Sequence, residues 1–220
     1  LEEEVDFILE TVGRYLEKAP SRKDVLCVYA GLRPLAAPKN HADSAKTKEI
    51  SRSHKLVVSE SGLVTITGGK WTTYRQMAQE TIDIAVRNSS LPYFKCLTKT
   101  LKIHGYQENP DRSSWKYIYG SDQANIKKLE AENPRYSETL HKSYSFTVGE
   151  VIWAVRNEMA RSVDDVLARR VRALYLDARA SMEMAPGVAE IMAGELNKDR
   201  EWIKSQTDEY IELAKAYMIS

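Results

Sequence analysis

Apolar residues recur at helical spacing at the start of the chain. Over residues 1–16 they fall on one face of a helix, as an amphipathic helix requires. The residues of this apolar face are Val5, Ile8, Leu9, Val12 and Leu16. The polar sequence EKAPSRK, which contains a proline, follows and ends the pattern. We therefore expect the chain to begin with an amphipathic helix.

The next pattern is an unbroken apolar run over residues 25–30. A short run of this kind is typical of a strand that is buried on both faces. Gly31 and Pro34 follow it, and both residue types interrupt regular structure. The run predicts a buried β-strand.

Two further apolar runs and a helical pattern follow along the chain. The runs at residues 56–58 and 63–66 predict two strands, and Gly62 between them favours a tight turn. Residues 70–88 then place apolar side chains on one helical face. This stretch is predicted to fold as a hairpin followed by a helix.

Beyond the sequence NSSLPY the pattern becomes helical, and three helix starts can be located. Thr147 with Glu150, and Ser162 with Asp165, have the spacing of a capping box, in which a hydroxyl and a carboxylate satisfy free backbone N–H groups. A last amphipathic helix is expected from about Asp199. We place a domain boundary near residue 94, with an α/β segment before it and an all-α domain after it, which makes the fold class α+β.

Composition excludes several classes of protein. The 32 Lys and Arg residues nearly balance the 31 Asp and Glu residues, giving a net charge of +1, so no nucleic-acid partner is expected. Cys27 and Cys96 lie far apart, are predicted to be reduced thiols and suggest a cytoplasmic protein. No residue spacing predicts a metal site or a membrane-spanning helix. Because the chain starts at Leu1 within a helical pattern, we expect a fragment of a longer protein.

Three cations occupy positions at which ligands are commonly bound. Arg33 follows one predicted strand, Arg52 precedes another, and Lys70 follows Gly68 and Gly69 where a strand becomes a helix. Two glycines there would expose backbone N–H groups at a helix start, where negative charge is favoured. The alternatives are structural ion pairs for the arginines and an ordinary tight turn for the glycines. The spacing differs from that of a P-loop.

Other candidates have simpler interpretations. His54 could approach a site but is interpreted as a half-exposed histidine at the start of a strand. Trp71 could stack on a planar ligand, although a tryptophan beside a helix start is more often a core residue. The basic sequence ARRVRAL over residues 168–174 follows Asp164 and Asp165, and we expect salt bridges along one helix face.

Three segments together carry a resemblance to a known family. YAGLRPL, SRSHKLVVSESGLVTITGGKWTTYRQMAQ and ARSVDDVLARRVRALYLDARA closely resemble, in this order, the FAD-dependent glycerol-3-phosphate dehydrogenases, which are D-amino-acid-oxidase-like flavoproteins. The match covers most of residues 25–88 and about 147–185, whereas residues 95–145 match loosely. The resemblance implies oxidation of sn-glycerol 3-phosphate to dihydroxyacetone phosphate, with hydride transfer to FAD and electrons passed to quinone.

The resemblance also implies roles for individual residues. Arg33, Arg52 and Lys70 would bind the substrate, while the backbone from Gly68 to Thr72 would contact the flavin. The implied cofactor-binding residues are Gly68, Gly69, Lys70, Trp71 and Thr72. The full enzyme would be a peripheral protein at the inner face of the cytoplasmic membrane, with no certain catalytic residue within this chain.

One family feature is missing, because no Gly-x-Gly-x-x-Gly fingerprint for FAD occurs in the 220 residues. Residues 1–94 are therefore interpreted as the C-terminal remnant of the cap and FAD-binding domains, and residues 95–220 as a helical C-terminal domain. The chain alone is expected to be inactive and to bind FAD only as part of the complete protein. A bare strand edge could pair with a second copy in a homodimer.

Two alternatives stay open at this point. The first is an alpha-glycerophosphate oxidase, which would use the same cations and pass electrons to oxygen. The second is a helical interaction module without enzymatic activity, which residues 95–220 could form by themselves.

Overall fold

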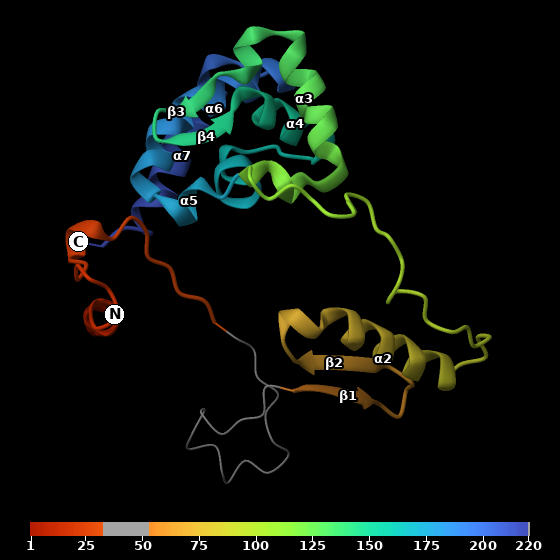
Figure 1. Cartoon of the computed structure of the whole chain (residues 1–220). Helices are drawn as coiled ribbons and strands as arrows, with labels where there is room; N and C mark the ends of the chain where they lie inside the picture. The colour runs from red at the N-terminus through yellow and green to blue at the C-terminus, as the bar shows by residue number, and fades with distance from the viewer. Residues whose placement is uncertain (33–52, 220) are drawn as a thin grey trace. The chain divides into compact units, whose positions relative to one another are not determined.

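The computed structural model describes residues 1–32 and 53–219, and the chain divides into two compact units (Figure 1). Unit 1 combines Leu1–Ala30 with Gly105–Ser220, and unit 2 comprises Gly31–His104. The N-terminal residues thus group with the helical part of the chain. Domain limits at 1–94 and 95–220 stay a prediction for the complete protein.

Unit 2 consists of an antiparallel hairpin and a helix, as the sequence predicts. Its elements are β1 (His54–Val58), β2 (Val64–Gly68), the 3-10 turn η4 (Trp71–Thr73) and α2 (Tyr74–Arg87). The register places His54 opposite Gly68 and Leu56 opposite Ile66. Gly62 forms the hairpin turn with a φ of +82°, which confirms the reason for a glycine there. Helix α2 packs along β2.

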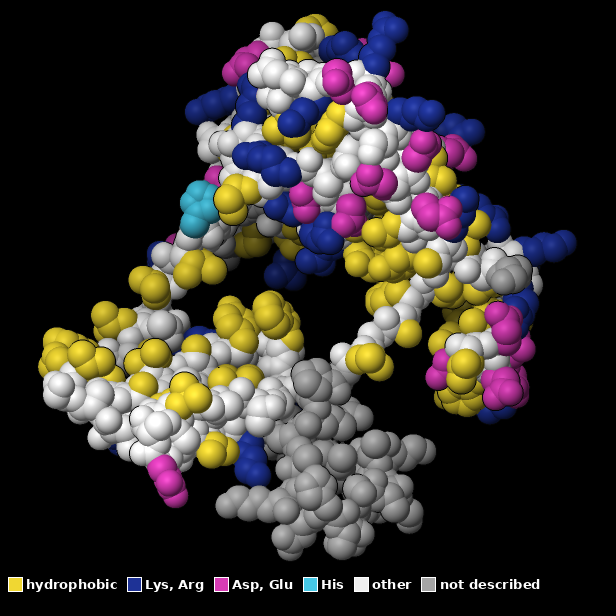
Figure 2. Space-filling model, turned by 180° about the vertical axis from the view of Figure 1, so that it is seen from behind, with side chains coloured by type: hydrophobic (Ala, Val, Ile, Leu, Met, Phe, Trp, Pro, Cys, Tyr) yellow, Lys and Arg dark blue, Asp and Glu magenta, His cyan; other side chains and the backbone are white. Residues whose placement is uncertain are grey.

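The surface of unit 2 carries many exposed apolar side chains (Figure 2). They come from the hairpin, from α2 and from the segment after it. The largest are Val57, Leu63, Trp71, Tyr74, Ile82, Leu91, Tyr93, Phe94, Leu97, Leu101 and Ile103. Apolar surface on this scale is typical of a face that other protein covers.

Unit 1 is mainly helical. From its N-terminus the elements are α1 (Glu2–Gly13), η1 (Arg22–Asp24), η5 (Trp115–Asp122), α3 (Gln123–Glu132), η6 (Pro134–Ser137), β3 (Thr139–His141), β4 (Tyr144–Thr147), α4 (Val148–Asn157), the π-helical η7 (Asp165–Arg170), α5 (Ala173–Leu176), α6 (Ala178–Leu196) and α7 (Arg200–Lys215). The helical prediction is confirmed, but the hairpin β3–β4 was not predicted. Strands of three and four residues are too short to show a reliable alternation.

Helix α6 forms the centre of unit 1. It contacts α4, α5 and α7, and buries Met184, Val188 and Met192 completely or almost completely. Buried side chains of the neighbouring elements surround it, and together they form one core. The main members from those elements are Phe146, Val151, Val155, Val163, Leu167, Leu174, Tyr210 and Ala214. A continuous core of this kind supplies most of the stability of the unit.

Hydrogen bonds at the expected caps confirm the helix starts. The Thr147 N–H donates to Glu150 Oε2 over 2.8 Å, and Asp199 Oδ1 accepts from the Trp202 N–H over 2.9 Å at the start of α7. The Asp165 N–H donates to Ser162 Oγ over 3.2 Å, but the turn it begins continues as η7. The sequence therefore located the caps correctly but not the π-helical geometry.

The buried strand predicted for residues 25–30 is wrong. This segment is extended, but within the described ranges it joins neither two-stranded sheet. The Val28 N–H donates to the carbonyl of Tyr217 over 2.8 Å, and the carbonyl of Leu26 accepts from the Ala178 N–H over 3.0 Å. Cys27 packs on the core of unit 1, whereas Leu26 and Tyr29 stay 50% and 70% exposed, so packing within the described residues accounts for only part of the apolar run.

Helix α1 confirms the first prediction, although its apolar face is largely exposed. Phe7, Ile8 and Val12 are not buried by the rest of unit 1. Arg22 holds the returning chain against the helix through ion pairs with Glu2 and Asp6. No helix in the described part of the chain combines the length and hydropathy needed to cross a bilayer.

A buried polar group, the carboxyl of Glu150, lies at the start of α4 close to side chains of η5 and α3. Glu150 is 0% exposed, and its cap partner Thr147 also donates through Oγ1 to Glu130 Oε1 over 2.6 Å. Lys116 Nζ lies 2.5 Å from the same Glu130 oxygen. Burial raises the pKa of Glu150 to about 7, although hydrogen bonds from Thr147 and the charge of Lys116 oppose the shift.

The stability of unit 1 should therefore fall as pH rises toward neutrality. The folded carboxyl keeps a proton up to a pKa of about 7, whereas the unfolded carboxyl releases it at its ordinary 4.5. The stabilising contribution is complete below pH 4.5 and is lost as pH rises through 7. The full shift corresponds to at most about 3 kcal/mol. Glu150→Gln should remove this dependence and keep the cap.

Urea unfolding followed by tryptophan fluorescence at about pH 5.5 and about pH 8 measures the effect. The exposed residue Glu132 provides the control, since Glu132→Gln should leave the pH dependence intact. An identical pH dependence in Glu150→Gln and the wild type would show that this carboxyl does not cause it.

Candidate functional site

The candidate site is the turn that joins the end of β2 to the start of α2. Gly68 has a φ of +72° and Gly69 a φ of +89°, so two consecutive residues adopt a backbone conformation that favours glycine. Lys70 returns to an extended conformation, with a φ of −121° and a ψ of 145°, and η4 begins at Trp71. The glycines let the chain reverse direction within two residues.

The inner side of this turn lies directly on the rest of unit 2. A Cβ atom on Gly69 would lie 2.6 Å from Sδ of Met77 and 3.1 Å from Cβ of His54. The first separation is shorter than any normal contact, so a larger residue would have to displace the thioether. Gly69 is therefore required both by its φ and by the close approach of β1 and α2.

The outer side of the turn presents a cation and an aromatic ring. Within residues 1–32 and 53–219 the ammonium of Lys70 has no hydrogen-bond or ion-pair partner, and the side chain is exposed. Trp71 is 85% exposed, and its ring stacks on Tyr74 at 5.3 Å and 25°. The interpretation of Trp71 as a core residue is wrong for the part of the chain that the structure describes, because none of its residues buries the indole.

The backbone at this position is suited to an anion or to a planar group with hydrogen-bond acceptors. The N–H and hydroxyl of Thr73 both donate to the carbonyl of Lys70 over 3.0 Å, which fixes the first turn of η4. The first N–H groups of a helix, here from Trp71 and Thr72, have no acceptor within the helix. Their dipoles add to the positive charge of Lys70.

The structure describes only part of the predicted set of site residues. It brings together Gly68, Gly69, Lys70, Trp71 and Thr72, which are consecutive in the sequence. Arg33 and Arg52, the other predicted substrate-binding residues, lie outside the described residues. Their distance from Lys70 stays a prediction.

Sequence analysis missed the contact beneath the turn. His54 does begin β1, as predicted, but its side chain is only 19% exposed and its Nε2 lies 2.6 Å from Oε2 of Glu80. Met77 and Glu80 are three residues apart and so share one face of α2. That spacing was the available signal, but it could not indicate which strand residue the helix would meet.

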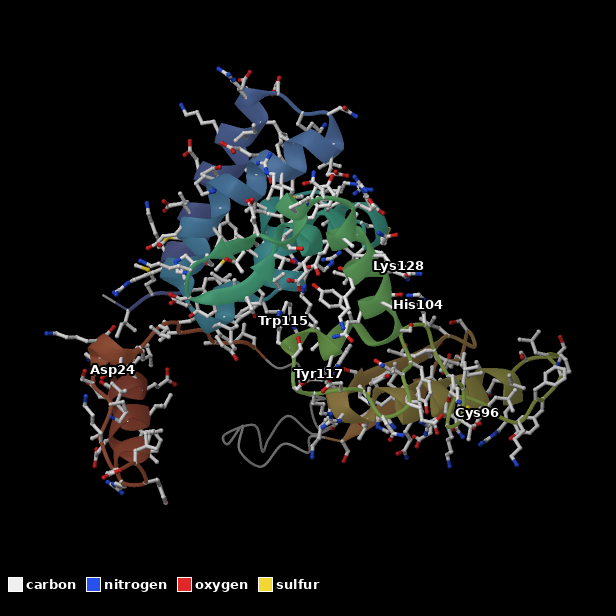
Figure 3. All side chains as sticks on the ribbon, turned by 45° about the horizontal axis from the view of Figure 1, so that its top comes forward. Asp24, Cys96, His104, Trp115, Tyr117 and Lys128 are labelled. Atoms are coloured by element: carbon white, nitrogen blue, oxygen red, sulfur yellow. The ribbon has the colours of Figure 1, made fainter. Side chains whose placement is uncertain are left out.

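The opposite face of α2 borders an apolar groove of about 500 Å³. The segment after the helix forms its other wall. Its lining includes Arg75, Ile82, Phe94, Cys96, Leu97 and Leu101. Cys96, labelled in Figure 3, lies 3.0 Å from Oγ1 of Thr98, and hydrogen bonding lowers the pKa of its thiol. Both cysteines are free, as predicted.

The basic sequence in unit 1 is a paired helix face and not a binding patch. Arg169 forms ion pairs with Asp164 and, at 3.2 Å, with Asp165. This confirms the salt-bridged interpretation of the sequence after Asp164. Within the described residues, no cluster of three or more His, Cys, Asp or Glu side chains has the geometry of a metal site.

Comparison with known proteins gives consistent relatives. The chain is 32% identical over 248 residues to a mitochondrial glycerol-3-phosphate dehydrogenase of Arabidopsis thaliana, covering 99% of this chain and 38% of that protein. It is 33% identical over 242 residues to the mitochondrial enzyme of Bos taurus, covering 99% and 32%. A probable mitochondrial glycerol-3-phosphate dehydrogenase of Caenorhabditis elegans is 34% identical over 241 residues, covering 98% and 32%.

The chain thus spans about a third of the length of these relatives. A family match covers residues 64–203, from β2 through the start of α7, and so includes parts of both units. It also includes the whole glycine turn. The chain belongs to the family described as the C-terminal domain of alpha-glycerophosphate oxidase.

Proposed function

We propose that the chain is the C-terminal part of an FAD-dependent enzyme that oxidises sn-glycerol 3-phosphate to dihydroxyacetone phosphate. The observation that carries this proposal is the Gly68–Gly69–Lys70 turn, which combines a tightly supported backbone with a cation that has no partner among the described residues. The names of the relatives supply the substrate, because they are glycerol-3-phosphate dehydrogenases.

The turn fits a flavin edge for a geometric reason. A side chain at position 69 would collide with Met77 and His54, so the glycine lets the backbone of the turn lie directly against β1 and α2. The N–H groups of Lys70, Trp71 and Thr72 would hold the pyrimidine edge of the isoalloxazine. FAD, when bound, accepts the hydride from the substrate carbinol. The positive end of the helix would stabilise negative charge at that edge.

The cations would bind the phosphate of the substrate. Lys70 supplies a mobile point charge, and Arg33 and Arg52 would supply planar guanidinium groups that can bind two phosphate oxygens at once. Binding the phosphate at a distance from the reacting carbon would orient the carbinol C–H for hydride transfer. This division of roles requires Arg33 and Arg52 to approach Lys70 in the complete protein.

The electron acceptor distinguishes two versions of the proposal. We favour a dehydrogenase that passes electrons to quinone and associates peripherally with a membrane, since the relatives are named dehydrogenases. The family description favours the second version, an alpha-glycerophosphate oxidase that uses oxygen. Peroxide formed in proportion to substrate consumed would identify the oxidase, and quinone-dependent turnover without peroxide would identify the dehydrogenase.

Compartment and assembly are further parts of the proposal. The relatives are named mitochondrial proteins, whereas the two cysteines led us to expect a cytoplasmic protein and the family resemblance implied a position at the inner face of the cytoplasmic membrane. A homodimer would cover exposed apolar surface of unit 2. The other alternative named above, a helical interaction module without enzymatic activity, has less support because the family match covers parts of both units.

In the complete protein, Lys70→Ala and Arg33→Ala should each cost about 2–4 kcal/mol in kcat/KM for sn-glycerol 3-phosphate, because a charge-assisted contact with phosphate is lost. Turnover of glycerol, which lacks phosphate, should change little. Steady-state kinetics with both substrates measures this difference. Lys55→Ala is the matched control, since Lys55 lies beside His54 on β1 and points to the other face of the strand. Equal losses with glycerol would contradict phosphate binding by these residues.

The chain of 220 residues should bind FAD only weakly by itself. Its turn can hold one edge of the flavin, but no fingerprint loop is present to hold the pyrophosphate. Equilibrium dialysis of the purified chain against FAD measures the dissociation constant. A sub-micromolar value would contradict the division of the FAD site between this chain and the rest of the protein.

A further inference from the structure

Two polar side chains lie beneath the glycine turn, on its side that faces β1 and α2. The proposed function gives them no role. His54 Nε2 lies 2.6 Å from Glu80 Oε2, and the imidazole N–H donates to the carboxylate. Gln76 orients the same carboxylate, because its Nε2 donates to Glu80 Oε1 over 2.7 Å. The hydrogen bond from Gln76, and after it the one from His54, holds the pKa of Glu80 below its ordinary value.

The pair connects β1, the first strand of the hairpin, to α2, the helix that follows the turn. His54 is the first residue of β1 and stands opposite Gly68, the last residue of β2. Glu80 lies in the second turn of α2, one helical turn beyond Met77. The contact therefore links the end of the hairpin from which the glycine turn begins to α2, the helix that the turn leads into.

Packing beneath Gly69 leaves the turn little freedom to compensate for a change in this contact. The Cβ of His54 and the thioether of Met77 both lie within 3.1 Å of the position that a Gly69 Cβ would take. A shift of α2 relative to β1 would therefore move the backbone of Gly69. The ammonium of Lys70 and the N–H groups of Trp71 and Thr72 follow directly in the chain, so they would move as well.

The exposure of the pair shows that stabilising the fold is not its main effect. The His54 side chain is 19% exposed and that of Glu80 is 39% exposed. A pair as accessible as this contributes roughly 0–1 kcal/mol to folding. A displacement of about 1 Å at a binding site, in contrast, can lower activity by about a hundredfold. The pair is therefore more important for the geometry of the turn than for the stability of the fold.

We propose that His54 is a positioning residue. Through its hydrogen bond with Glu80, it sets the position and orientation of the Gly68–Thr72 turn relative to α2. It thereby sets the position of Lys70 relative to the anionic ligand. The identity of that ligand, the phosphate of sn-glycerol 3-phosphate, rests on the proposed function. The effect of the pair on the turn is independent of it. No other described side chain makes a polar link between β1 and α2.

Four variants of the complete protein test the proposal. His54→Leu and Glu80→Ala remove the contact. His54→Gln is the conservative variant, because a glutamine Nε2 can donate at the position of the imidazole Nε2. Arg75→Ala is the control on the same helix, since Arg75 lies on the opposite face of α2 and donates to Gln79 Oε1 over 2.8 Å.

Amide hydrogen exchange without substrate is the first measurement. Exchange of the Thr73 amide, which donates to the carbonyl of Lys70, should rise about tenfold in His54→Leu and Glu80→Ala, and should stay near the wild-type rate in His54→Gln and Arg75→Ala. The double variant should behave like either single variant, because both remove the same contact. Unchanged exchange at the turn would overturn the proposal, as would an equal rise throughout the hairpin and α2, which would indicate a structural role only.

Kinetics provide the second measurement and keep the two proposals apart. The KM for sn-glycerol 3-phosphate should rise about tenfold in the variants that lose the contact and recover in His54→Gln. A normal KM in His54→Leu, in an enzyme that turns over this substrate, would overturn the positioning role. If the wild-type protein does not use the substrate but the turn responds as expected, the positioning role is supported and the proposed function is wrong.

Discussion

The structure of unit 2 depends on one steric constraint, the absence of space for a side chain at Gly69. A Cβ atom on this residue would collide with Met77 and His54, and its φ of +89° is one that other residues rarely adopt. This constraint lets β2 pass into α2 within a few residues. It also leaves the outer side of the turn to Lys70 and Trp71, which carry the proposed function. The same contact beneath the glycine gives the His54–Glu80 pair its influence on the site.

Unit 1 is stabilised in a different way, by one apolar core around α6 and by caps at the helix starts. The cap at Thr147 places Glu150 where water cannot reach it, so the pKa of this carboxyl rises to about 7. A simple capping pattern thereby acquires a response to pH. Neither unit buries all of its apolar surface: helix α1 in unit 1 and both faces of unit 2 keep exposed apolar side chains. This agrees with a chain that spans a third or so of its relatives.

Sequence patterns predicted the features that depend on local interactions. The hairpin with Gly62, helix α2, the caps at Thr147 and Ser162 and the glycine turn all follow from neighbouring residues. The errors arose where distant residues decide the outcome. Residues 25–30 are extended and hydrogen-bonded to helical elements instead of pairing in a sheet, and Trp71 is exposed because the described residues of unit 2 do not cover it. The contact of His54 with Glu80 joins residues 26 positions apart, which no local pattern could indicate.

The path of the chain makes unit 2 an insertion within unit 1. The chain leaves unit 1 after Ala30 and returns to it at Gly105, and Leu26 and Val28 are hydrogen-bonded to the two ends of the C-terminal helical region, at Ala178 and Tyr217. Unit 2 is thus connected along the chain to unit 1 at both of its ends. A unit that is connected at both ends can diffuse less freely than a unit on a single linker. Its effective concentration near surfaces of the unit to which it is connected is therefore higher. Unit 1 contributes no residue to the glycine turn, but its connections to both ends of unit 2 would in this way limit the volume within which the turn can move.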